Sequence, residues 1–85
     1  MDDLIPLELV NDGQWAEVAE VCGDPTWVVR MAELGVRLGS RLKVIRSGRP
    51  CILQIGEARL SLRGDQTLQI LVRPVSVALK ATAGK

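Results

Sequence analysis

Few side chains in this sequence could carry out chemistry. The chain of 85 residues has no histidine, so it lacks the side chain that most often moves protons near neutral pH. Its two cysteines, Cys22 and Cys51, lie far apart in sequence, and no second thiol accompanies either of them. Neither a Cys–His pair nor a Ser–His–Asp triad can be assembled from this set. The residue types argue against an enzyme, and we expect no catalytic residue.

Metal and cofactor binding are equally poorly supported. Zinc and iron favour imidazole or clustered thiolate ligands, and the chain offers neither. Asp2, Asp3 and Asp12 could hold a hard cation weakly, but a solvated acidic loop is the simpler interpretation. Gly35 and Gly39 fit neither the phosphate-binding loop nor the dinucleotide-binding pattern. We therefore expect no metal site and no cofactor.

The start of the chain and its hydropathy predict the compartment. The segment 1–6 has no basic stretch followed by an apolar one, which a secretory signal would need. No apolar run approaches the ~20 residues of a membrane span. We expect a cytoplasmic protein that does not itself span a membrane. In that compartment Cys22 and Cys51 should stay reduced, and we interpret both as small buried hydrophobic residues.

The charges are divided unevenly along the chain. Residues 1–24 hold seven acids and no base, whereas residues 25–85 hold eleven bases and three acids. Such asymmetry can mark a charged binding face, but more often strands of opposite charge are neighbours on a solvated surface. The bases after residue 40 alternate along predicted strands, and no aromatic residue follows Trp27. Because barrels that bind single-stranded RNA stack bases on aromatic rings, no nucleic-acid partner is expected.

One short helix is predicted near the start of the chain. Asp24 can cap free N–H groups, Pro25 suits the first helical position, and Gly35 suits a left-handed end. The helix is expected over residues 25–34. Its apolar face would comprise Trp27, Val28, Met31, Ala32 and Leu34.

The remaining elements are predicted to be strands. Apolar and polar residues alternate, or apolar residues run together, over 14–22, 41–46, 51–55, 58–63 and 69–73. A helix is the alternative for 14–22, although turn residues on both sides favour a strand. Pro74 is expected to end the last strand.

These elements predict a mainly β fold. We expect a closed or nearly closed barrel of about five strands, with the helix inserted after the first strand. The domain would cover residues 1–74, followed by a C-terminal extension over 75–85. Residues 75–79 alternate again, which suits an edge strand, a pairing element in a dimer or a frayed end.

The order of these signals resembles a known family. A helix ends in Leu34-Gly35-Val36, a turn at Gly39 leads into a strand, and Leu60-Ser61-Leu62-Arg63 precedes a final Ile70-Leu71-Val72. This order is similar to that of the ferrous-iron transport protein A (FeoA) family, over roughly residues 7–74. Two features depart from the family pattern. Leu38 stands where proline is usual before the glycine, and the hairpin over 47–50 is shorter than many.

The resemblance implies an SH3-like barrel that acts beside FeoB, the membrane ferrous-iron transporter with a cytosolic GTP-binding domain. The protein would modulate this partner rather than carry iron, and FeoB would recruit it to the inner face of the membrane. Homo-oligomerisation stays open. The alternatives are a ligand-sensing or adaptor domain in metal-dependent transcriptional regulation and a small RNA-binding barrel.

The family offers no catalytic residues to transfer, so the docking surface is a separate hypothesis. Large aromatic, methionine and arginine side chains are enriched at interface cores. We expect the helix and the loop after it to contact the partner through Trp27, Arg30, Met31, Val36 and Arg37. The alternative is that Trp27 and Met31 close the barrel from the apolar face of the helix.

Overall fold

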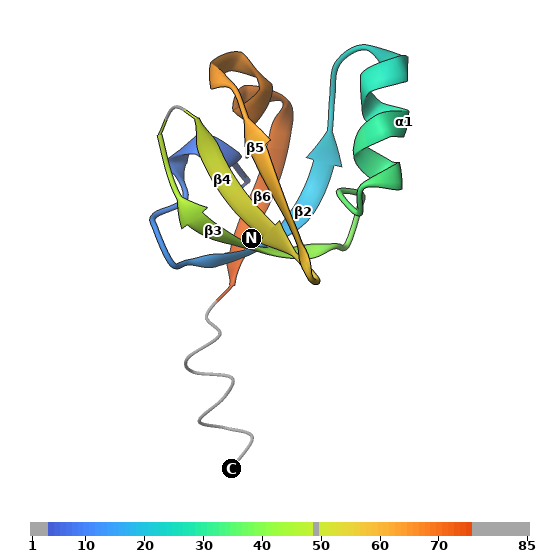
Figure 1. The fold of residues 1–85 in the computed structure, drawn as a ribbon. Helices are drawn as coiled ribbons and strands as arrows, with labels where there is room; N and C mark the ends of the chain where they lie inside the picture. The colour runs from blue at the N-terminus through green and yellow to red at the C-terminus, as the bar shows by residue number, and fades with distance from the viewer. Residues whose placement is uncertain (1–3, 49, 76–85) are drawn as a thin grey trace.

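A computed structural model describes residues 4–48 and 50–75 of the chain. Its strands are β1 (Ile5–Pro6), β2 (Trp15–Val21), β3 (Arg41–Arg46), β4 (Cys51–Ile55), β5 (Ala58–Leu62) and β6 (Ile70–Val75). The helix α1 (Pro25–Glu33) follows β2, and two 3₁₀ helices, η1 (Leu7–Leu9) and η2 (Gly64–Gln69), precede β2 and β6. Figure 1 shows these elements in one strongly curved sheet with α1 at its side. The predicted mainly β class, with a single α-helix among the described residues, is confirmed.

The six strands form one antiparallel sheet in the order β1-β6-β2-β3-β4-β5. Alternate residues of each strand point to opposite faces, so one set of side chains turns into the barrel. Leu42 and Val44 of β3 are both 0% exposed, while Arg41 between the turn and Leu42 is exposed. The core brings together Leu7, Val10, Ala16, Val18, Met31, Val36, Leu42, Val44, Cys51, Leu53, Leu62, Ile70 and Val72.

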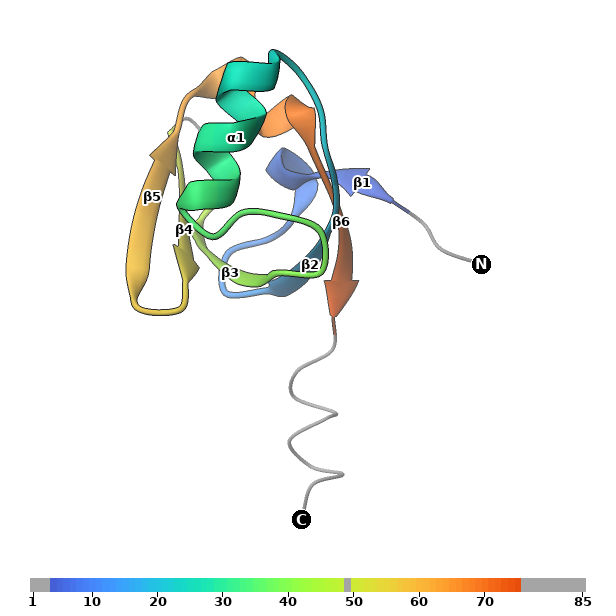
Figure 2. The ribbon, with the colours of Figure 1, turned by 90° about the vertical axis from the view of Figure 1, so that its right-hand side faces the viewer.

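The curved sheet does not close through hydrogen bonds. Its two end strands are β1 and β5, which are not neighbours in the pairing order. Figure 2 shows α1 in front of the barrel, between β5 on one side and β6 on the other. The helix therefore covers part of the side that the sheet leaves open.

The ends of α1 are set by its local sequence. The Asp24 carboxylate accepts a hydrogen bond from the Thr26 N–H at 2.8 Å, and Pro25 follows at the first helical position. At the other end Gly35 takes φ +105°, and the Val36 N–H donates to the Met31 carbonyl at 2.8 Å. This left-handed end satisfies free carbonyls of the last turn. The predicted helix is confirmed, with Leu34 as its C-terminal cap rather than its last residue.

Three local features differ from the sequence prediction. The pair Ile5–Pro6 forms an additional short strand, and the 3₁₀ helix η2 extends to Gln69, so the last strand begins at Ile70 rather than at residue 69. Pro74 does not end β6, which continues to Val75. The reason is that β1, over the residues that the structure describes, pairs with Leu71 and Val72 and not with Pro74, so at Pro74 the described part of the sheet has β2 on one side and an edge on the other. A residue without an N–H is tolerated on such an edge. Of the predicted extension over residues 75–85, Val75 belongs to β6, and the rest lies outside the described residues.

Candidate functional site

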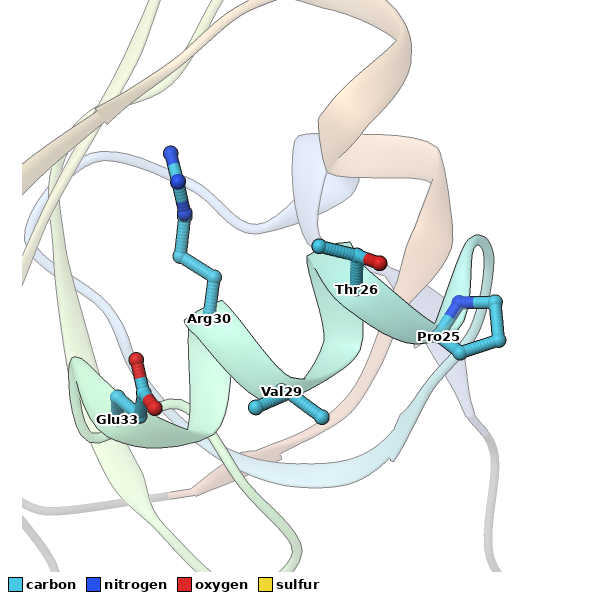
Figure 3. Close-up of a pocket in the computed structure, with 5 residues that line it drawn as sticks. All are labelled: Pro25, Thr26, Val29, Arg30 and Glu33. Carbon is cyan, nitrogen blue, oxygen red and sulfur yellow. The ribbon is translucent and has the colours of Figure 1, made fainter.

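The outward face of α1 is the first of two recessed surfaces on this helix. Pro25, Thr26, Val29, Arg30 and Glu33 line an open recess of about 420 Å³. Helical spacing explains the grouping, because residues three and four apart lie on one side. In Figure 3 Arg30 and Thr26 extend to one side of the helix axis and Val29 points to the other. Val29 is 56% exposed, so an apolar side chain is accessible to solvent among polar neighbours.

A smaller recess lies on the other side of α1, where the helix meets β2 and the loop before β3. Its volume is about 250 Å³. Apolar side chains dominate its lining, with one acid and one base among them: Glu20, Val21, Val28, Ala32, Val36, Arg37 and Leu38. Among the large apolar residues that the structure describes, Leu38 is the most exposed, at 71%. The turn therefore places an apolar side chain beside an apolar recess.

The five predicted contact residues separate into two groups. Met31 is 5% exposed and Val36 is 0% exposed, so both belong to the core and present almost no surface. Trp27 is half-buried and packs against the core. Arg30 and Arg37 are exposed, on different recesses. Only the two arginines and part of the tryptophan are accessible to a partner.

The Trp27 ring leaves a polar atom without a partner. Its Nε1–H is buried and finds no acceptor within the described part of the chain. A buried donor that makes no hydrogen bond costs about 1–3 kcal/mol. The ring is therefore held by apolar packing alone. Its main role is to anchor α1 on the core rather than to contact a partner.

The two thiols lie in different environments. Cys51 is 0% exposed in β4, and burial raises the pKa of its thiol. The prediction that both cysteines are buried is wrong for Cys22, which is only partly buried because the chain leaves the sheet just before it. Its Sγ donates to Glu20 Oε2 at 3.4 Å, and this hydrogen bond, with desolvation, raises the pKa of the Cys22 thiol. Both thiols are therefore protonated at neutral pH, and the protonated form is a weak nucleophile and metal ligand.

Residues 4–48 and 50–75 contain neither a metal-ligand cluster nor a membrane-spanning helix. No group of three or more His, Cys, Asp or Glu in this part of the chain is placed to hold a metal ion. No helix in the same residues is long and apolar enough to cross a membrane.

The outer face of the sheet carries an arrangement that sequence reasoning missed. Trp15 lies directly opposite Lys43, although the two are far apart in sequence. Glu17 lies between Arg41 and Arg73 in the pairing, with Arg73 Nη1 4.0 Å from Glu17 Oε1. Acidic and basic strands are therefore neighbours. This agrees with the interpretation of the charge asymmetry in which strands of opposite charge lie side by side on a solvated surface. The pairing of β2 with β3 is the information that would have shown that the Trp15 ring lies among basic side chains.

Known structures with the same fold include several iron-related proteins. The solution structure of FeoA from Chlorobium tepidum has a TM-score of 0.79 at 28% identity, covering 85% of this chain and 71% of that one. Zinc-bound FeoA from Stenotrophomonas maltophilia, an SH3-domain protein, has a TM-score of 0.70 at 22% identity, covering 87% of this chain and 92% of that one. The expected SH3-like architecture is confirmed.

A longer regulator also contains this fold. A manganese-dependent transcriptional repressor has a TM-score of 0.78 at 24% identity, and the match covers 88% of this chain but 44% of the repressor. No curated protein matches the chain. The FeoA domain model matches residues 5–74, from the first strand to the penultimate residue of the last. The chain therefore belongs to the FeoA domain family.

Proposed function

We propose that this protein is a non-catalytic cytoplasmic accessory of ferrous-iron uptake, which docks on the FeoB GTPase-transporter at the inner face of the membrane. The observation that carries the proposal is the FeoA domain over residues 5–74. The S. maltophilia relative, which has been suggested to activate ferrous iron transport, supports the same process. Two protonated thiols and the absence of histidine from the sequence leave little for catalysis.

Helix α1 is the surface that best suits docking. Protein interfaces combine an apolar centre with a polar rim, and both recesses beside α1 have this composition. Val29 and Leu38 would supply apolar contact, while Arg30 and Arg37 would supply direction and charge. The proposed contact set therefore keeps the accessible members of the predicted set and adds the two exposed apolar residues Val29 and Leu38. Met31 and Val36 would act indirectly, by holding the helix in place.

A binding measurement with purified FeoB tests this surface. We expect Arg30→Glu and Leu38→Asp each to weaken binding at least tenfold, because both side chains are exposed and their replacement should leave the fold intact. The matched control is Arg46→Glu, which reverses an exposed arginine at the end of β3. Trp27→Ala is a poorer probe, since the ring packs against the core. Equal affinity for all of these folded variants would remove α1 from the interface.

The consequence of docking is read from GTP turnover by FeoB with and without this chain. A change in turnover that Leu38→Asp abolishes would show modulation through α1. Binding without any change in turnover would instead assign a positioning role. Turnover by this chain alone would contradict a non-catalytic accessory.

A small RNA-binding barrel is the second candidate, and one observation favours it. Trp15 lies opposite Lys43, so the outer face of the sheet places an aromatic ring beside a positively charged side chain. Single-stranded nucleic acids bind to such combinations, with affinity that falls steeply as salt rises. Titration of a labelled single-stranded RNA in rising salt distinguishes this candidate. Trp15→Ala should abolish binding if the ring stacks a base.

A further inference from the structure

The two end strands of the sheet differ in how well their free edges are protected. β1 has only two residues, and one of them is Pro6. β5 has five residues, contains no proline, and pairs with β4 in unbroken register from Ala58 to Leu62. Natural sheets protect exposed edges with short strands, prolines, bulges or charges, because an open ladder recruits another strand. β1 carries two of these protections, whereas β5 relies on the charge of Arg59.

On the side of β5 away from β4, where no strand among residues 4–48 and 50–75 pairs with it, the strand carries backbone groups that can pair. In an antiparallel ladder, successive residues direct their N–H and C=O groups to opposite neighbours. Ala58 lies opposite Ile55 across the two-residue turn at Gly56–Glu57, an arrangement in which the flanking pair is hydrogen-bonded. Arg59 and Ser61, the residues between, therefore direct their backbone groups away from β4. Both side chains are exposed.

The sequence around β5 is complementary to itself in one antiparallel register. When two copies pair with Leu60 opposite Leu60, Glu57 of each copy lies opposite Arg63 of the other, and Arg59 lies opposite Ser61. Glu57 and Arg63 are both exposed. Opposite charges on facing residues stabilise an antiparallel pair, and like charges destabilise it.

The neighbouring registers are less favourable. A shift that centres the pair on Arg59 places two arginines directly opposite each other. A shift that centres it on Ser61 places Arg59 opposite Arg63, twice. A slip by one residue would mismatch the inner and outer faces of the strands. The register centred on Leu60 is therefore the one that charge selects.

The inner face of β5 gains from the same pairing. Leu60 packs against the core yet is only partly buried, and Ala58 is exposed. In the selected register Leu60 meets its own copy, and Ala58 meets Leu62. Apolar side chains at the open edge of one barrel would then be covered by those of a second barrel. Each Å² of apolar surface removed from water contributes roughly 25 cal/mol.

We propose that β5 is a self-association edge, through which two copies of this chain join their sheets antiparallel about a twofold axis at Leu60. This interface is isologous, so every contact occurs twice. It lies on a different element from α1. The proposal is independent of docking on FeoB, and its test uses no partner protein.

Sedimentation equilibrium of the full chain, from micromolar to millimolar concentration, tests the proposal. We expect the mass to rise from the 9.2 kDa of one chain towards twice that value. Glu57→Arg or Arg63→Glu alone places two pairs of like charges opposite each other, and each should raise the dimer Kd roughly tenfold at low salt. The double variant Glu57→Arg/Arg63→Glu restores opposite charges, and we expect it to recover most of the lost affinity.

A backbone variant tests the edge itself. Ser61→Pro removes an N–H that faces away from β4, so the β4–β5 ladder should persist while edge pairing is lost. Circular dichroism establishes that each variant is folded before its mass is measured. A wild-type chain that stays monomeric at millimolar concentration overturns the proposal. So does a dimer that neither the single reversals nor Ser61→Pro weakens, or one that the double variant fails to restore.

Discussion

The barrel and the helix α1 contribute very differently to this molecule. The strands bury side chains such as Leu42, Val44 and Leu53 completely, whereas Met31 is the one fully packed residue of α1. The rest of the helix is half-buried or exposed and is flanked by recesses. The barrel supplies stability, and the helix supplies accessible surface. Substitutions should therefore separate folding from partner binding according to the element in which they lie.

The largest expected effect is in the barrel. Leu53→Ala removes a side chain that is 0% exposed in the middle of β4, and we expect a loss of about 3 kcal/mol in unfolding free energy. Urea denaturation followed by circular dichroism measures this loss. Leu68→Ala is the matched control, since Leu68 is 50% exposed, and it should cost less than about 1 kcal/mol. Equal losses for the two leucines would break the distinction between core and surface.

The next effect is at the contact between helix and barrel. Met31→Ala should lower the unfolding free energy by about 2 kcal/mol, because the side chain is 5% exposed and lies at the core. Hydrogen exchange should accelerate more in α1 than in β3 and β4, since Met31, together with Trp27, holds the helix against the core. Uniform acceleration across all elements would mean that helix and barrel open only as a unit.

A smaller effect is expected at the start of α1. Asp24→Ala removes the acceptor of the Thr26 N–H bond and should cost about 1 kcal/mol. Asp24→Asn keeps an acceptor of the same length and should be nearly neutral. Thermal denaturation of both variants measures the difference. If both destabilise equally, the negative charge rather than the capping hydrogen bond stabilises this end.

The smallest effect concerns pH and lies in the barrel loops. Asp12 accepts hydrogen bonds from the Ser47 N–H at 2.6 Å and the Ser47 hydroxyl at 2.8 Å, and these bonds lower the pKa of its carboxyl below 3.8. A lowered folded-state pKa gives stability that is present above the unfolded pKa and lost as the pH falls through the folded one. Denaturation midpoints between pH 5 and pH 2 should therefore fall more steeply for the wild type than for Asp12→Asn. Parallel profiles would show that this link between loops contributes nothing.

The sequence predicted the helix and the strands of this fold better than it predicted which strands pair with each other. Strands β3 and β4 have the bounds that alternation indicated, and Asp24 with Gly35 located the helix. These signals are local, so a single sequence contains them. The strand Ile5–Pro6 was missed because two residues carry no period, and it exists only through its pairing with Leu71 and Val72.

The candidate site was predicted less well, for a related reason. Residue type selected Met31 and Val36 as contact residues, but Met31 lies on the buried face of α1 and Val36 enters the core after the left-handed end of the helix. In the sequence, Leu38 was interpreted as an ordinary turn residue, although it is 71% exposed beside an apolar recess. The pairing of Trp15 with Lys43 is also non-local. Burial and neighbourhood depend on the whole fold, which residue type does not encode.

The position of β6 in the sheet has a consequence for synthesis. This last strand lies between β1 and β2, so the first strand has no sheet neighbour until residues 70–75 have been made. A nascent chain leaving the ribosome can form α1 and the β3–β4–β5 hairpins early, because their contacts are local. The complete sheet must wait for β6, which joins β1 to β2. Until then Leu7, Val10 and the inner side of β2 stay open to chaperones.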